Sequence, residues 1–103
     1  ASCLVGSEMC IRDSGKRLRA AGRRIPLIVG EWNVQNTADG LREMTPSEKD
    51  ELYCTLAELF QDGFSECLGW FYWSWKITAG GIDADCDDAA RCVTKGWLKI
   101  RNI

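Results

Sequence analysis

The 103-residue sequence contains no histidine. This absence excludes the Ser-His-Asp and Cys-His arrangements, because both use an imidazole to take the proton from the nucleophile. The chain also lacks any apolar run near the roughly 20 residues that a membrane-spanning helix needs. Basic residues do not outnumber acidic ones, and the formal net charge is −2. We therefore expect neither nucleic acid nor a membrane as a partner.

Six cysteines are present, but none forms a C-x2-C pair, so a zinc site would need unusual spacing. The sequence predicts no metal and no other cofactor. The cysteines are either scattered, half-buried thiols, or they include a disulfide that joins Cys86 to Cys92 or Cys54 to Cys67 in an exported enzyme; the spacing does not prove either pairing. The amino terminus lacks the layout of a signal peptide, but a fragment would have lost its signal. The compartment is therefore left open.

Alternating acids at Asp83, Asp85 and Asp87 are spaced as in a calcium loop. The glycine and the final glutamate of that loop are replaced here by Asp88 and Thr94. We interpret the acids instead as a loop and the first turn of a short helix, where the helix dipole favours negative charge. This helix is predicted to continue from residue 89 to 95, and the segment after it is predicted to pack back on the domain.

An apolar run at residues 25–29 has the length and the β-branched content of a strand buried on both faces. Gly30 follows it, and Glu31 stands where the strand should end. A carboxylate in this position is either a loop-facing acid or helix cap, or a catalytic group at the carboxyl end of a barrel strand. The run itself does not distinguish these alternatives.

A second strand is predicted at residues 68–76, where Trp70 to Trp75 are all aromatic except Ser74. Alternation places Phe71, Trp73 and Trp75 on one face and Trp70 with Tyr72 on the other, and so many aromatic residues predict burial of both faces. The rings either fill a core or offer flat surfaces on which sugar rings stack.

The segment between the two strands begins a helix at Thr45-Pro46-Ser47-Glu48, which has the pattern of a capping box with proline in the first turn. Helical spacing then predicts one buried face, with Gln61 on the opposite side. Its buried residues are predicted to be Leu52, Leu56, Leu59, Phe60 and Gly63. This helix would connect two parallel strands as a right-handed βαβ unit.

The motifs Ile-Val-Gly-Glu-Trp at 28–32 and Gly-Trp-Phe-Tyr-Trp-Ser-Trp-Lys at 69–76 together resemble the last two strand ends of a glycoside hydrolase family 5 enzyme, nearest to its exo-β-1,3-glucanase-like branch. The resemblance covers about residues 15–103. It implies an α/β fold that is the C-terminal part of a (β/α)8 TIM barrel, namely the last two strands with their helices. It also implies Glu31 as the nucleophile and Trp73 as the stacking platform for a β-glucan or glucoside.

Further candidates for substrate binding are Trp75 and, in the segment that follows Glu31, Trp32, Asn33 and Gln35. Polar loop chemistry by itself also explains the loop residues. The general acid of the family is the Glu of an Asn-Glu pair, and no such pair occurs in this sequence. Because a (β/α)8 barrel typically needs about 250 residues, we expect this chain to be a fragment that requires the missing N-terminal barrel strands. Without the general acid, the fragment should be inactive alone, and its exposed sheet edges should be prone to aggregation.

The first fourteen residues show no clear amphipathic period, and residues 3–14 resemble a translated sequencing-adaptor junction. We expect residues 1–14 to be a non-native leader; the alternative is a genuine strand and loop from further up the barrel. Residues 15–24 are predicted to form the final turns of a helix that ends at Gly22. Two other functions stay open for the whole chain: a non-catalytic carbohydrate-binding module and a purely structural α/β domain.

Overall fold

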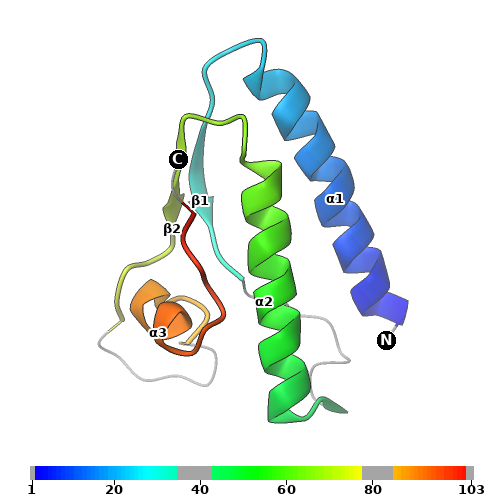
Figure 1. The fold of residues 1–103 in the computed structure, drawn as a ribbon, viewed down its shortest axis with the longest axis vertical. Helices are drawn as coiled ribbons and strands as arrows, with labels where there is room; N and C mark the ends of the chain where they lie inside the picture. Colours follow the sequence, from blue (N-terminus) through cyan, green and yellow to red (C-terminus); the bar gives the residue numbers. More distant parts are fainter. Residues whose placement is uncertain (1, 35–42, 78–84, 102–103) are drawn as a thin grey trace.

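The computed structural model describes residues 2–34, 43–77 and 85–101, which form a small mixed α/β domain with a two-stranded parallel sheet (Figure 1). Both long helices run in one direction, and the strands run back in the other (Figure 1). The elements in chain order are α1 (Ser2–Gly22), β1 (Ile28–Trp32), α2 (Pro46–Gly63), β2 (Gly69–Tyr72) and α3 (Ala89–Thr94).

The parallel pairing of β1 with β2 confirms the predicted strand, helix, strand order. Ile28 pairs with Gly69 and Val29 with Trp70, but the next pair joins Trp32 to Tyr72, so β1 carries one extra residue in between. Backbone bonds extend the pairing at both ends, from Leu68 N to Leu27 O at 2.7 Å and from Trp73 N to Trp32 O at 2.9 Å. This irregularity falls at Gly30 and Glu31.

Helix α2 begins at the predicted capping box. The Thr45 side chain accepts from the Glu48 amide at 3.2 Å, and the Glu48 carboxylate accepts from the Thr45 amide at 3.3 Å. These two bonds pair amides that the first helical turn would otherwise leave without partners. Pro46 occupies the first turn, where a missing amide costs nothing.

Helix α1 ends at Gly22 as predicted, but it begins at Ser2, so the alternative of a strand and loop in this stretch is wrong. No proline interrupts residues 2–22. Ile11, Gly15 and Leu18 follow helical spacing and face α2. The helices approach most closely at Gly15, where an added Cβ would lie 3.0 Å from the Gly63 Cα.

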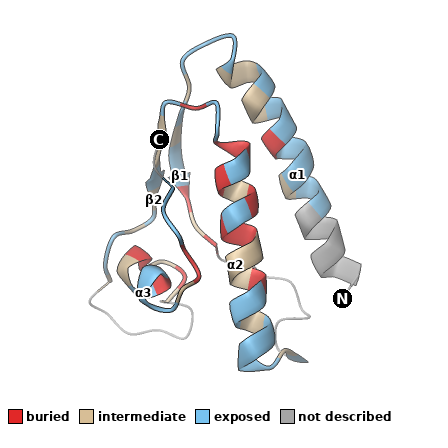
Figure 2. Cartoon of the chain, viewed as in Figure 1, coloured by how far each residue is buried: buried red, intermediate tan, exposed pale blue. Residues whose placement is uncertain are grey.

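The Trp32 ring is at the centre of the core, where it contacts rings from β2 and from α2 and its C-terminal end. Buried and exposed residues alternate along α2 (Figure 2). The centroid of the Trp32 ring is 5.4 Å from that of Phe60, 5.2 Å from those of Phe64 and Trp70, and 5.0 Å from that of Tyr72. Three of these pairs meet edge to face, which aromatic quadrupoles favour. Trp70 and Tyr72 therefore lie on the face of β2 that alternation assigned to them together.

The segment after α3 packs back on the domain, as predicted. Trp97 donates from Nε1 to the Asp50 carboxylate at 2.7 Å, and Leu98 is fully buried. Gln61 was predicted on the exposed side of α2, and this is wrong: its side chain is buried, donating to Lys99 O at 2.9 Å and accepting from the Arg101 amide at 3.1 Å. The terminal segment covers the side of α2 that the helix pattern left to solvent.

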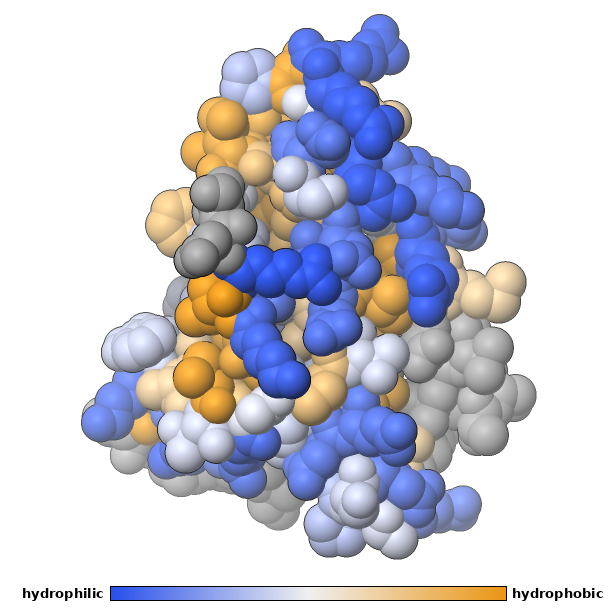
Figure 3. Space-filling view, viewed as in Figure 1, coloured by the Kyte–Doolittle hydropathy of each residue, from blue (hydrophilic) through white to orange (hydrophobic). Residues whose placement is uncertain are grey.

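The prediction that both strands are buried on both faces is also wrong for this structure. Ile28 is 60% exposed and Phe71 64% exposed, whereas Trp32 on the helix-facing side is 6% exposed. No element among the described residues covers this second face. Residues of high hydropathy reach the surface on the side where the strands lie, and at smaller places elsewhere in this view (Figure 3). We call this exposed face, with Ile28 and Phe71, the open face of the sheet; Trp73 and Trp75, in the segment directly after β2, are exposed as well.

Candidate functional site

Glu31 lies on β1 directly before its last residue, and its side chain is exposed. The extra residue in β1 decides this placement. Strict alternation from exposed Ile28 would turn Glu31 toward the helix and Trp32 toward solvent, whereas the irregularity leaves Gly30 and Glu31 exposed and buries Trp32. In register, Phe71 is the residue of β2 that lies across from Gly30 and Glu31.

Trp73 follows the last residue of β2 and is 57% exposed, and Trp75 is 67% exposed. The peptide bond between Trp73 and Ser74 is cis. Because the strands are parallel and Trp73 N bonds to Trp32 O, Glu31 and Trp73 lie at the same end of the sheet. A carboxylate and a flat indole thus share one end of the sheet, where an uncharged ring with an apolar face and hydroxyl groups could meet both.

Two other predicted substrate contacts are placed differently. Trp32 sits in the core, with its Nε1 buried and without a hydrogen-bond partner in the described structure, so it does not reach the surface that carries Glu31. Asn33 is half-buried and donates from Nδ2 to the Asp87 carboxylate at 2.9 Å. Gln35 lies outside the described residues.

A buried hydroxyl links the chain leaving β1 to the turn before α3. Tyr72 donates to Cys86 O at 2.6 Å and accepts from the Val34 amide at 3.2 Å, and its oxygen lies 3.5 Å from the Cys92 Sγ. Burial, together with the Cys92 contact, raises the pKa of Tyr72 well above its ordinary value. Alternation placed Tyr72 on the same face as Trp70, but the sequence carries no signal for these hydrogen-bond partners, which lie far away along the chain.

Asp88 joins the start of α3 to the segment that follows β2. Asp88 caps α3, accepting from the Arg91 amide at 2.9 Å, and also accepts from the Ile77 amide at 3.0 Å. These two amide bonds, with a further contribution from the Arg91 charge, lower the pKa of Asp88. The described acids precede α3, as predicted, but none lies in its first turn, because Asp88 is the N-cap residue. Asp83 lies outside the described residues.

Neither suggested disulfide is formed in the structure. The Cys54 thiol donates to Gly96 O at 3.1 Å, and the Cys92 thiol donates to Asp85 O at 3.1 Å. Burial raises the pKa of Cys92, which disfavours its reactive thiolate. Among the described side chains, those of residues 9–34, 43–77 and 85–101, no three of His, Cys, Asp or Glu are grouped so that they could hold a metal ion.

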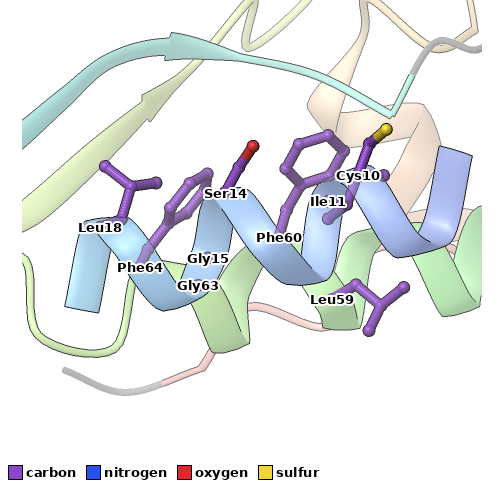
Figure 4. A pocket seen from close by; sticks show the side chains of 9 residues that line it. All are labelled: Cys10, Ile11, Ser14, Gly15, Leu18, Leu59, Phe60, Gly63 and Phe64. Atoms are coloured by element: carbon purple, nitrogen blue, oxygen red, sulfur yellow. The ribbon is translucent and has the colours of Figure 1, made fainter. Parts of the chain in front are cut away.

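An apolar pocket of about 170 Å³ lies between α1 and α2 (Figure 4). Phe60 from α2 and Phe64, the residue directly after α2, lie beside Ser14 and Leu18 from α1 at this pocket (Figure 4). None of the candidate site residues lines it. The pocket is therefore separate from the end of the sheet that carries Glu31.

Comparison with known proteins adds no relative to this picture: no family model matches the chain, and no curated protein is significantly similar to it. The described helices include none that is both long enough and apolar enough to cross a lipid bilayer. The case for a function therefore rests on the geometry of the site and on the sequence motifs.

Proposed function

We propose that this chain is the carboxy-terminal part of a (β/α)8 barrel from a retaining β-glucan hydrolase, with Glu31 as its nucleophile and Trp73 as the platform under the sugar. The observation that carries the proposal is that the exposed Glu31 carboxylate and the exposed Trp73 indole lie at the same end of a parallel sheet. Active sites of such barrels lie at the carboxyl ends of the strands, where Glu31 and Trp73 stand.

The layering supports the same proposal. In a (β/α)8 barrel the helices cover the outer face of the strands, and the other face forms the interior. Here α2 packs against Trp32 on β1 and Trp70 on β2, while Ile28 and Phe71 remain exposed. The open face would then be the interior of the barrel, completed by the missing N-terminal strands.

The proposed chemistry needs two carboxyl groups about 5–5.5 Å apart. The Glu31 carboxylate attacks the anomeric carbon, the glycosidic C–O bond breaks, and the second carboxyl group protonates the departing oxygen. Water then cleaves the glycosyl ester, giving its proton to the second group and restoring Glu31. Because the sequence has no Asn-Glu pair, the second group would come from an earlier strand.

The test uses the protein translated from the complete reading frame that contains this chain. Reading the coding DNA upstream of Gly15 should reveal an Asn-Glu pair after a buried strand. Glu31→Gln should lower hydrolysis of an aryl β-glucoside by at least about 10⁴-fold while glucan binding survives. Glu58→Gln, which changes an exposed acid on α2, is the control and should leave turnover unchanged.

A fluorinated glucoside offers a direct test of the nucleophile. A 2-deoxy-2-fluoroglucoside with a good leaving group slows breakdown of the ester, so the peptide that contains Glu31 should gain the mass of the sugar. Unchanged turnover in Glu31→Gln, or a label on a different carboxylate, would overturn the proposal.

The exposed Trp73, Trp75 and Phe71 also favour a second candidate, a carbohydrate-binding module that does not hydrolyse its ligand. This candidate predicts that the 103-residue chain itself binds a soluble β-glucan, and that Trp73→Ala removes the binding while Glu31→Gln does not. A chain without glucan binding and without a hydrolytic parent would leave the purely structural interpretation.

A further inference from the structure

The proposed nucleophile and platform lie where the strand pairing stops. The last bond between the strands runs from Trp73 N to Trp32 O at 2.9 Å, and the chains then separate. Glu31 is two residues before Asn33, and Trp73 directly precedes Ser74. The contacts of Asn33 and Ser74 therefore decide how firmly the two functional side chains are held relative to one another.

Asp87 contacts both chains. Its carboxylate accepts from Asn33 Nδ2 at 2.9 Å, and its carbonyl accepts from the Ser74 amide at 2.6 Å and from the Ser74 hydroxyl at 3.1 Å. A bond to a charged carboxylate is stronger than a bond between neutral groups. One residue thus joins the two strand ends just past the last bond of the ladder.

Asp87 is itself held by its neighbours. The Ala89 amide donates to Ser74 O at 2.8 Å, and the Ala90 amide donates to Trp75 O at 3.0 Å. Asp88, which is almost fully buried, accepts from the Ile77 amide at 3.0 Å. These bonds fix residues 87–90 along residues 74–77, so the Asp87 carboxylate reaches Asn33 from a rigid support.

We propose that Asp87 is a positioning residue, which acts through Asn33 and Ser74 to fix the separation of the Glu31 carboxylate from the Trp73 ring. This proposal rests on the proposed hydrolase function. It assigns Asn33 a new role, because its amide is turned to Asp87. A catalytic geometry must hold to within about 0.5 Å, and a shift of about 1 Å can cost about 100-fold in rate.

The experiment compares Asn33→Ala, Asp87→Ala and the double variant in the complete reading frame. Each single variant should lower kcat by about 10- to 100-fold with a smaller change in KM, and the double variant should be no worse than either. Asp87→Asn keeps an oxygen that accepts from Asn33 and should recover most of kcat. Asp85→Ala is the matched control, because Asp85 pairs with Arg91 and Lys95 at the surface. If Asp87→Ala does not fold, Asn33→Ala removes the same bond from the other side.

A second readout does not depend on activity. In Asn33→Ala, the Val34 amide hydrogen, which bonds to the Tyr72 hydroxyl, should exchange with solvent about 10-fold faster, because the segment that follows β1 loses its bond to Asp87. Unchanged exchange would overturn the proposal. Effects of the two single variants that multiply in the double variant would also overturn it. So would an Asn33→Ala variant with raised KM and normal kcat, because this result would mark Asn33 as a direct sugar contact. Normal turnover in Glu31→Gln would instead overturn the hydrolase function, and the exchange result would still decide the role of Asp87.

Discussion

Removal of the Tyr72 hydroxyl should destabilise the junction between β1 and the turn before α3. Tyr72→Phe removes the acceptor of the Val34 amide, at 3.2 Å, and the donor to the Cys86 carbonyl, at 2.6 Å. Val34 is fully buried, so water does not easily replace the lost partner. Leaving a buried group unpaired costs about 1–3 kcal/mol, and we expect a loss in this range, chiefly from the Val34 amide, because the Cys86 carbonyl also accepts from the Cys92 thiol at 3.9 Å.

Urea unfolding followed by tryptophan fluorescence measures this loss at pH 7. The control is Thr55→Ala, which removes a hydroxyl that bonds within its own helix, to Glu51 O at 2.9 Å. This change should alter the free energy of unfolding by less than about 0.5 kcal/mol, as expected for a substitution away from buried networks. A loss of similar size in both variants would refute the assignment of Tyr72 as the residue that ties the two segments.

The raised pKa of Tyr72 adds a pH dependence to the same experiment. The folded state holds the phenolic proton above pH 10, whereas the unfolded chain releases it near its ordinary pKa of about 10. The unfolded state then binds fewer protons, so this contribution to stability is full below about pH 10 and falls above it by at most about 1.4 kcal/mol per pH unit. Phenylalanine does not titrate, so the difference between wild type and Tyr72→Phe should shrink above pH 10. A constant difference would contradict the burial of the hydroxyl.

Two further predictions concern the helix contact and the acids. Gly63→Ala should destabilise the chain by about 1–3 kcal/mol in urea unfolding, because the new Cβ would lie 2.9 Å from the Gly15 Cα. Gly69→Ala is the control and should cost little, because a Cβ at Gly69 meets nothing within 4 Å. Asp88 has a lowered pKa, so its contribution to stability is present above about pH 4 and is lost as the pH falls through the lowered value. Asp88→Asn should flatten this acid dependence of the urea midpoint, and an equal slope in both proteins would show that other carboxyl groups cause it.

Local chemistry made much of the fold predictable. The Thr45 capping box depends on residues three positions apart, and the facing of Trp70 and Tyr72 depends only on the pleat of a strand. Both predictions are confirmed because neither needs knowledge of distant residues. The parallel pairing followed in the same way from two apolar strands separated by a helix.

The details of the candidate site depend on contacts that a sequence does not display. The extra residue in β1 reverses the alternation after Val29, so Gly30 and Glu31 are both exposed and Trp32 enters the core. Gly30 is the only local sign of that irregularity. The Asn33 contact with Asp87 spans 54 positions, and the Gln61 contact with Lys99 spans 38. Distances of this kind along the chain leave no periodic signal.

The composition of the open face bears on the choice between the proposed functions. A sugar gains from stacking on flat rings such as Trp73, but an aliphatic side chain such as Ile28 offers no such surface and gains most from burial against protein. Parallel sheets are almost always covered on both faces, and a two-stranded sheet is rarely stable by itself. Ile28 lies at the start of β1 and Trp73 past the end of β2, so further polypeptide could cover the first while the second stays open to a ligand. This division favours a barrel with a site at one end over a binding module whose whole face remains in water.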